Sequence, residues 1–409
     1  MLVLIYKNNL DHLLKDKKVL NVPPLRFPEF SGEWEEHTLS EYLEFKNGLN
    51  PDAKRIGQGL PFISVMDILA EGVITYNSIR GKVEATDKEI DCFGVKNGDL
   101  LFQRSSETLE DVGRANVYMD SRTAVYGGFV IRGRKIGNYV PLFFKYLLAT
   151  PLARKKTCRM GAGAQHFNIG QEGLSKISLS FPSVKEQEKI ANLLSLIDER
   201  IATQNKIIED LKKLKSAIIH CCYSSKTDMV SLSELLKQCS ERNRSATDLQ
   251  VLSVNNKYGF IAQSDQFEDR EVASDDTTNY KVVEKGMFAY NPARINVGSI
   301  ALYEMDGKGI VSPMYVCFTT KRTLLPGYLK HYFASQTFRH EMFKRLEGSV
   351  RLCLTFDSLC NIEIPLPSIE LQENVGKYLS TIERKISLEE SMLSQYQLQR
   401  SYLLSQMFI

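Results

Sequence analysis

Two short segments contain residue types that could act on a nucleobase or a phosphodiester. Residues 291–294 read Asn-Pro-Ala-Arg and begin like the Asn-Pro-Pro-aromatic sequence of adenine methyltransferases, but the second proline and the aromatic residue that stacks on an extruded base are missing. Pro51 and Asp52 precede Lys54 as in part of a nuclease motif, but no second acidic residue and lysine follow at the required spacing. Neither segment predicts catalysis.

The histidines and cysteines, which are common zinc ligands, are scattered along the chain. The six histidines show no pairing at metal or catalytic spacing, and the eight cysteines form no Cys-x-x-Cys motif. This pattern is typical of free thiols in a reducing compartment. No P-loop and no glycine-rich turn after a strand offers a site for a nucleotide or a methyl donor. We therefore expect no metal, no cofactor and no catalysis from this chain alone.

The composition is that of an ordinary globular protein. The chain has 409 residues, of which 43% are hydrophobic and 25% are charged, and this length allows two domains with connecting helices. The formal net charge is only +3, so total charge gives no argument for nucleic-acid binding. No apolar run approaches the roughly 20 residues of a membrane span, and the opening MLVLIYKNN is too short for the core of a signal peptide. We expect a cytoplasmic protein that does not cross a membrane.

The elements that must position any functional residue are organised by an internal duplication. Residues 181–223 carry apolar side chains at alternating steps of four and three, which is typical of a coiled-coil seam, and the pattern returns 185 positions later. The polar interruptions coincide as well, because Gln204 matches Glu389 and Lys215 matches Arg400. The seam residues are Ile190, Leu194, Ile197, Ile201, Ile208, Leu211 and Ile218 in the first copy, then Val375, Leu379, Ile382, Ile386, Leu393 and Leu403 in the second.

Each repeated segment begins with signals for the start of a helix. Ser183 and Ser368 are suitable N-caps, each preceded by a proline, and Glu186 is expected to complete a capping box in the first copy. Each helix could extend over about 40 residues, or roughly 60 Å. A helix of that length with a single apolar seam needs a partner, and the nearest candidate is its own repeat.

Mixed strand and helix patterns precede each long helix, so we expect two similar α+β domains. Three strand segments recur in both halves, whereas the segments between them differ in length and content, which is typical of copies that bind different ligands. The matched strands are 60–65 with 249–254, 95–102 with 283–290, and 124–130 with 310–316. We divide the chain into an N-terminal arm at 1–22, a first domain at 23–180, a first long helix at 181–225, a second domain at 226–365 and a second long helix at 366–409.

Taken together, these features resemble the specificity subunit of type I restriction–modification systems. The resemblance rests on the repeat, on the connector PPLRFPEFSGEW at 23–34, on Gln-Glu at 187–188 and 372–373, and on YNPARINVGSIALY at 290–303. It implies two target-recognition domains, each reading one half of a split DNA sequence. It also implies that the two long helices pack antiparallel as a coiled-coil spacer with pseudo-two-fold symmetry.

The resemblance also implies the partners. Two methyltransferase subunits would dock beside the helices and restriction subunits would complete a complex that methylates adenine and cleaves double-stranded DNA. S-adenosylmethionine, ATP and Mg²⁺ would belong to those subunits and not to this chain. Two alternatives stay open from the residues, namely a coiled-coil scaffold without DNA readout and the specificity part of a fused methyltransferase.

The unmatched loops carry the groups that read base edges. Arginine contacts guanine, asparagine and glutamine contact adenine, and serine contacts either base. A glycine-rich turn at 161–166 presents backbone groups and a glutamine, and it aligns with 348–351 in the second half. The candidate DNA-binding residues are Gln103, Arg104, Ser105, Arg114 and Gln165 in the first half, then Asn291, Arg294, Asn296 and Arg351 in the second.

Overall fold

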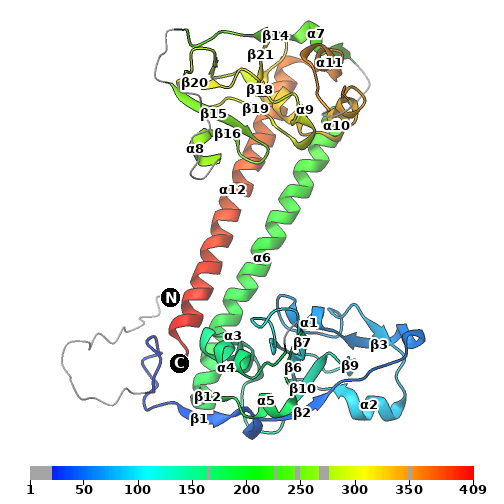
Figure 1. Cartoon of the computed structure of the whole chain (residues 1–409), viewed down its shortest axis with the longest axis vertical. Helices are drawn as coiled ribbons and strands as arrows, with labels where there is room; N and C mark the ends of the chain where they lie inside the picture. Colours follow the sequence, from blue (N-terminus) through cyan, green and yellow to red (C-terminus); the bar gives the residue numbers. More distant parts are fainter. Residues whose placement is uncertain (1–20, 164–165, 225–227, 245–248, 267–275, 349–351) are drawn as a thin grey trace, which may run out of the picture. The chain divides into compact units, whose positions relative to one another are not determined.

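The chain folds into two compact units. The computed structural model describes residues 21–163, 166–224, 228–244, 249–266, 276–348 and 352–409. The first unit extends to Gln204 and includes Met392–Ile409, and the second unit is Asn205–Ser391. The two long helices, α6 (Val184–Tyr223) and α12 (Ile369–Gln406), therefore contribute residues to both units (Figure 1). The arm expected at 1–22 lies almost entirely outside the described residues.

The first unit contains two four-stranded sheets. One is antiparallel, in the order β2 (Leu43–Asn47), β10 (Val130–Lys135), β6 (Leu100–Gln103) and β8 (Ala115–Val117). The other has the order β4 (Lys82–Val83), β3 (Ile56–Ile63), β9 (Ala124–Tyr126) and β5 (Gly94–Val95), with β3 and β9 parallel. Two short pairs join β1 (Glu35–Thr38) to β12 (Ser178–Phe181) and β7 (Ser105–Ser106) to β11 (Phe167–Asn168). The shorter helices are η1 (Leu39–Glu41), η2 (Ala53–Arg55), α1 (Val65–Leu69), α2 (Asp87–Phe93), α3 (Pro141–Ala149), α4 (Pro151–Arg159) and α5 (Gln171–Ser175).

The second unit repeats these sheets with the same neighbours. Its antiparallel sheet has the order β14 (Leu236–Cys239), β21 (Val316–Thr320), β18 (Phe288–Tyr290) and β19 (Ile300–Leu302). Its mixed sheet has the order β16 (Gly259–Ala262), β15 (Gln250–Asn255), β20 (Lys308–Val311) and β17 (Lys281–Glu284), with β15 and β20 parallel. A short pair joins β13 (Met229–Ser231) to β22 (Glu363–Pro365). The shorter helices are α7 (Leu232–Leu235), α8 (Gln263–Gln266), η3 (Ile295–Val297), α9 (Pro326–Phe333), α10 (Gln336–Phe343) and α11 (Phe356–Cys360).

Strand pairing corrects one expected correspondence by a single residue. Phe62 pairs with Val125 in the first unit, and Val251 pairs with Ile310 in the second. Because Phe62 and Val251 are equivalent, Val125 corresponds to Ile310, so 125–131 matches 310–316. The sequence match of 124–130 was wrong because both alignments superpose apolar residues, and only the partner strand fixes the register.

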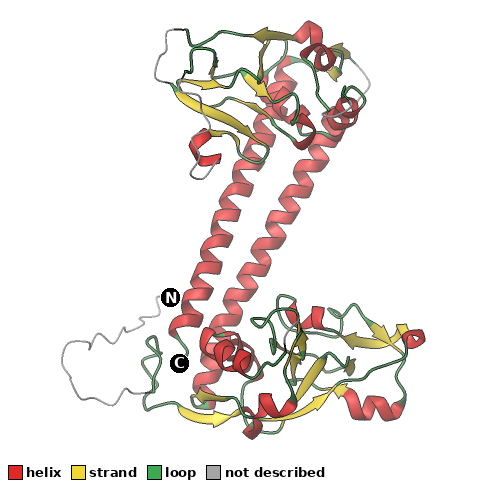
Figure 2. Cartoon of the chain, viewed as in Figure 1, coloured by secondary structure: helices red, strands yellow, loops and turns green. Residues whose placement is uncertain are grey.

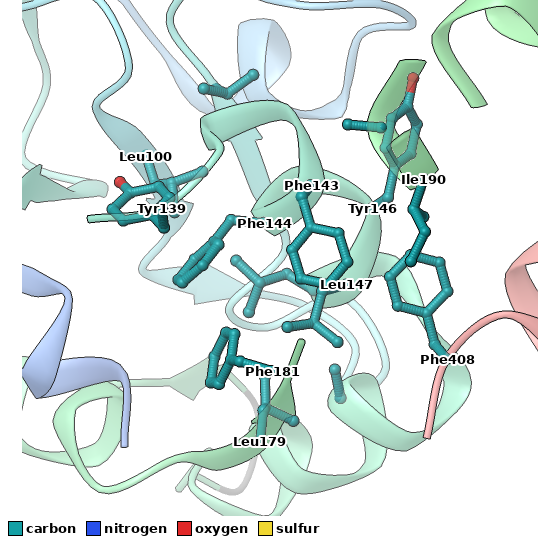
Figure 3. Packing of buried hydrophobic residues seen from close by; sticks show 14 of the residues in the cluster. Leu100, Tyr139, Phe143, Phe144, Tyr146, Leu147, Leu179, Phe181, Ile190 and Phe408 are labelled. Carbon is teal, nitrogen blue, oxygen red and sulfur yellow. The ribbon is translucent and has the colours of Figure 1, made fainter. Parts of the chain in front are cut away.

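An aromatic core holds the first unit to its part of the long helices. Phe144 stacks on Phe181 with ring centroids 5.0 Å apart, and Phe143 lies 5.4 Å from Phe408 near the end of the chain (Figure 3). Ile190 of α6 is in the same cluster. In the second unit Tyr223 of α6 packs against Tyr328 of α9, with ring centroids 4.8 Å apart. In both units a short helix after the sheets, α3 or α9, packs on α6 (Figure 2).

A buried glutamine fixes the start of each long helix. The Gln187 side chain is 2% exposed; its Oε1 accepts from the Val140 backbone N–H at 3.0 Å and its Nε2 donates to the Pro182 carbonyl at 3.0 Å. Gln372 makes the equivalent bonds, accepting from Leu325 and donating to Pro367, both at 2.9 Å. Val140 and Leu325 are the N-cap residues of α3 and α9. The repeated glutamine therefore uses one amide to satisfy backbone groups at two helix starts.

The long helices run antiparallel within each unit. In the second unit Lys212 pairs with Glu390 and Lys215 pairs with Glu383, each at 2.7 Å. The residue numbers of successive partners therefore rise along α6 and fall along α12. In the first unit Arg400 of α12 donates to Asp198 of α6 at 2.6 Å. The Asp198–Arg400 and Glu383–Lys215 pairs are related by the same offset as the repeat. All of the seam residues named from the sequence are buried or half-buried.

Glu186 does not form the expected capping box. Its backbone N–H donates to the Ser183 hydroxyl at 3.4 Å, so the cap is present. Its carboxylate instead accepts two hydrogen bonds from Arg26, both at 2.8 Å, and lies 3.4 Å from the Trp34 indole nitrogen. The predicted capping box is wrong because the Glu186 carboxylate is taken by Arg26, which lies 160 residues earlier in the chain. A motif that considers only neighbouring residues does not include such a partner. The connector at 23–34 is thereby anchored on the start of α6.

Candidate nucleic-acid interface

In the first unit the candidate base-reading residues follow strand β6. The Arg104 backbone N–H donates to the Phe129 carbonyl at 2.9 Å, and its carbonyl accepts from Ile169 at 3.0 Å. Ser105 in β7 pairs with Asn168 in β11. The segment after β6 is thus joined on one side to the turn between β9 and β10 and on the other to the end of the glycine-rich turn. These backbone bonds hold side chains from three distant parts of the sequence at one edge of the unit.

The side chains of this group differ in exposure. Gln103 is 4% exposed and its Nε2 donates to the Ser105 carbonyl at 2.9 Å, so the amide lies beneath the surface. Arg104 is half-buried, and its Nη1 donates to the Gly128 carbonyl at 3.4 Å. The Ser105 hydroxyl bonds to Asn168 Oδ1. Gln165 lies outside the described residues.

Arg114 lies beside a groove with more basic than acidic side chains. Its backbone carbonyl accepts from Gln103 at 2.8 Å, but its exposed guanidinium pairs with Asp111 at 2.8 Å and lines a cavity of about 880 Å³. Burial lowers the pKa of the cavity's Lys145 and Arg154 below their ordinary values. The basic residues that line it are Arg114, Lys145, Arg154, Lys155 and Arg400, and the acidic ones are Glu71, Glu110 and Asp198. Such a surplus of positive charge in a concave surface attracts phosphate groups.

The second unit places its candidates after the equivalent strand, β18. Leu354 donates to the Pro292 carbonyl at 3.1 Å, which reproduces the bond from Ile169 to Arg104 in the first unit. Asn291 follows β18 directly; its Oδ1 accepts from the Ala293 backbone N–H at 3.0 Å, and its Nδ2 lies 3.5 Å from the Met314 sulfur. One backbone tie is therefore the same in both units. The tie to the turn after β20 is made by the Asn291 side chain instead, because Pro292, the equivalent of Arg104, has no N–H.

The remaining candidates of the second unit are not gathered as closely. The Arg294 side chain is exposed, and the residue precedes η3. Asn296 is half-buried and lines a cavity of about 260 Å³ together with Arg339 of α10. Arg351 lies outside the described residues.

Asn168 is a neighbour of this surface that the sequence reasoning missed. It lies two residues beyond the glycine-rich turn that the sequence singled out, and its amide bonds to the Ser105 hydroxyl and to the His166 carbonyl. The signal that could have found it is the short apolar-polar alternation Phe167-Asn168-Ile169, which indicates a strand next to the turn.

Among the described residues, no three histidine, cysteine, aspartate or glutamate side chains gather closely enough to hold a metal ion. In the same parts of the chain, each helix is too short or too polar to cross a membrane.

Comparisons with known proteins agree with this geometry. Residues 31–213 and 225–395 both match the family model described as the type I restriction modification DNA specificity domain. The putative type I restriction enzyme MjaX specificity subunit of Methanocaldococcus jannaschii is 22% identical over 410 residues, covering 92% of this chain and 93% of that protein. The MjaVIII specificity subunit of the same organism is 23% identical, covering 92% and 91%.

A solved structure shares the fold. The type I restriction–modification S subunit from M. genitalium superposes with a TM-score of 0.61 at 16% identity, covering 95% of this chain and 99% of that one. The similarity extends over both units and both long helices.

Proposed function

Because this chain belongs to the family of type I restriction–modification DNA specificity proteins, we propose that it selects the DNA target of a type I complex and leaves the chemistry to its partners. The observation that supports this most is the repeat of the two sheets together with a divergent edge. In each unit the strand β6 or β18 leads to a loop that is tied by a backbone bond to the segment around Ile169 or Leu354, but the side chains on that loop differ. Each unit then reads its own short sequence, and the target is bipartite and asymmetric.

The candidate readers belong to loops that a rigid frame positions. We assign Arg104, Ser105 and Arg114 to the first half of the target and Asn291, Arg294 and Asn296 to the second, with Gln103, Gln165 and Arg351 as further candidates. Arginine and asparagine supply the bidentate contacts that separate guanine and adenine from other bases. The basic groove beside Arg114 would hold backbone phosphates.

The partners would be two methyltransferase subunits and the restriction subunits, acting in the cytoplasm. A feature that supports one methyltransferase for each unit is the set of large apolar side chains left exposed on the helices of each. In the first unit these are Leu196, Leu398 and Tyr402, and in the second they are Leu214, Tyr378 and Leu388. S-adenosylmethionine, ATP and Mg²⁺ would bind to the partner subunits.

The test is methyl transfer to a random DNA library by the purified chain combined with its partner methyltransferase. We expect methylated adenines to accumulate within a single bipartite sequence, and we expect neither protein alone to produce that pattern. Methylation by the isolated chain would make it an enzyme. Methylation whose sequence preference does not depend on the chain would reduce it to a scaffold. Either result rejects the proposal.

A further inference from the structure

The turn after β9 and the turn after β20 occupy the same place in the two units. Each follows the strand that pairs in parallel with β3 or β15, and each leads into the central strand β10 or β21 of the antiparallel sheet. With Val125 equivalent to Ile310, Phe129 is equivalent to Met314. The turn sequences have otherwise diverged, since Gly127-Gly128 in the first unit stands where Ser312-Pro313 stands in the second.

Both turns expose a large apolar side chain at their tip. Phe129 is 68% exposed and Met314 is 62% exposed, whereas the residues that follow them, Val130 and Tyr315, are buried. A single exposed apolar residue needs no explanation. Two exposed apolar residues at equivalent positions do need one, because each unit then forgoes the stabilisation that burying such a side chain would give. Packing within the unit does not account for either side chain, so a ligand is the better explanation.

Each tip contacts a residue assigned to base reading. In the first unit the Phe129 carbonyl accepts from the Arg104 backbone N–H at 2.9 Å, and the Arg104 guanidinium donates to Gly128 at 3.4 Å. In the second unit the Asn291 amide nitrogen lies 3.5 Å from the Met314 sulfur. An apolar group and a hydrogen-bonding group thus share one edge in both units. This combination fits the major groove, where the thymine C5 methyl group adjoins hydrogen-bonding base edges.

We propose that Phe129 and Met314 are the apolar base contacts of the two units, each meeting a thymine methyl group in its own half of the target. The inference rests on the proposed function and extends it. It assigns a specificity-determining role to two apolar residues, which cannot be found by looking for side chains that hydrogen-bond to bases. It also requires each half of the target to contain a thymine, on either strand, beside the base read by Arg104 or Asn291.

The experiment measures binding of the chain in complex with its methyltransferase to duplexes that carry the target found by methylation mapping. Replacing thymine by deoxyuridine in one half-site removes only the methyl group. We expect this to weaken wild-type binding several-fold. Phe129→Ala should weaken binding about tenfold, and deoxyuridine in the half-site of the first unit should then have no further effect. Met314→Ala should behave in the same way with the other half-site.

Matched controls separate this role from general loss of structure. Ile136→Ala, 60% exposed just beyond the opposite end of β10, and Met305→Ala, 40% exposed beyond β19, should bind like wild type and keep the deoxyuridine effect. Phe129→Leu keeps an apolar group and should retain most of the affinity. The inference is overturned if Phe129→Ala and Met314→Ala discriminate thymine from deoxyuridine as wild type does. A wild-type complex without sequence preference would instead reject the proposed function itself.

Discussion

At the scale of single residues, the candidate interface combines charged side chains with backbone groups that are hydrogen-bonded to neighbouring segments. Arg104 is held through its own N–H and carbonyl to two different turns, so its side chain starts from a fixed position. Arg294 has an exposed side chain, and its carbonyl accepts from Ser299 at 3.1 Å. Fixed backbone reduces the entropy lost when an arginine binds a base, which favours specificity.

Replacing Arg104 or Arg294 by alanine should reduce sequence selectivity. A good bidentate contact to guanine is worth about 1–3 kcal/mol of discrimination, so the ratio of target to random-sequence affinity should fall by about tenfold or more at one half-site. Competition binding with duplexes mutated in one half at a time measures this ratio. Arg322→Ala, in an exposed turn before α9, serves as the control. Unchanged selectivity in both variants would remove these loops from the readout.

His331 is a buried histidine of the second unit, and the equivalent position in the first unit holds no histidine. Its side chain is 1% exposed, and burial lowers its pKa to about 4; Lys330 and Lys215 lower this pKa further, and Glu383 opposes the shift. Its Nδ1 lies 3.7 Å from the Glu383 carboxylate, but a neutral imidazole forms no ion pair there. The equivalent residue in the first unit is Tyr146, whose hydroxyl donates to Asp198 at 2.9 Å.

The free energy of unfolding should therefore fall between pH 6.5 and pH 4. Above pH 6.5 the imidazole is neutral in both states, and its contribution is fully present. Below that value the unfolded chain takes up a proton that the folded chain does not, at a cost that approaches about 3 kcal/mol near pH 4. Urea unfolding at several pH values measures the loss, and His331→Tyr, which copies the first unit, should reduce it. An identical pH profile in that variant would contradict the assignment.

At the scale of elements, the start of each long helix depends on one glutamine. The sequence showed that Gln187 and Gln372 recur, but not why. The reason lies in tertiary contacts, since each amide bonds to a helix start 47 residues earlier in the chain.

The coiled-coil seam was predictable from the sequence because a helical period is a local property, and so were the two α+β halves. Three features were not predictable from the sequence, because each depends on a segment distant along the chain. These are the burial of Gln103, the partner of Glu186 and the one-residue shift of the third strand.

Gln187→Leu should destabilise the first unit. The change leaves the Val140 N–H and the Pro182 carbonyl buried without partners, each at a cost of about 1–3 kcal/mol. Thermal unfolding should show a loss of several degrees or more, and Gln372→Leu should have the same effect on the second unit. Gln395→Leu, at an exposed position on α12, is the matched control. A loss no greater than that of the control would show that the bonds contribute little.

At the scale of the whole molecule, the duplication explains why the two long helices are nearly equal in length. α6 has 40 residues and α12 has 38, and each continues without interruption from residues of one unit into residues of the other. The proposed bipartite target requires two recognition units and a constant number of unread base pairs between its two halves. A pair of matched helices can supply that constant because their seam fixes their register.

Removing seven residues from the middle of both helices should therefore shorten the unread gap of the target without changing its two halves. Seven residues preserve the seam, and they span about 10 Å, which corresponds to about three base pairs of duplex. Methylation mapping of the variant complex reads out both half-sites and the gap in one measurement. Removing seven residues from α6 alone leaves the ionic pairs with α12 out of register, so this control should lose stability. If the double deletion folds and methylates DNA with the original gap, the helices do not set the spacing.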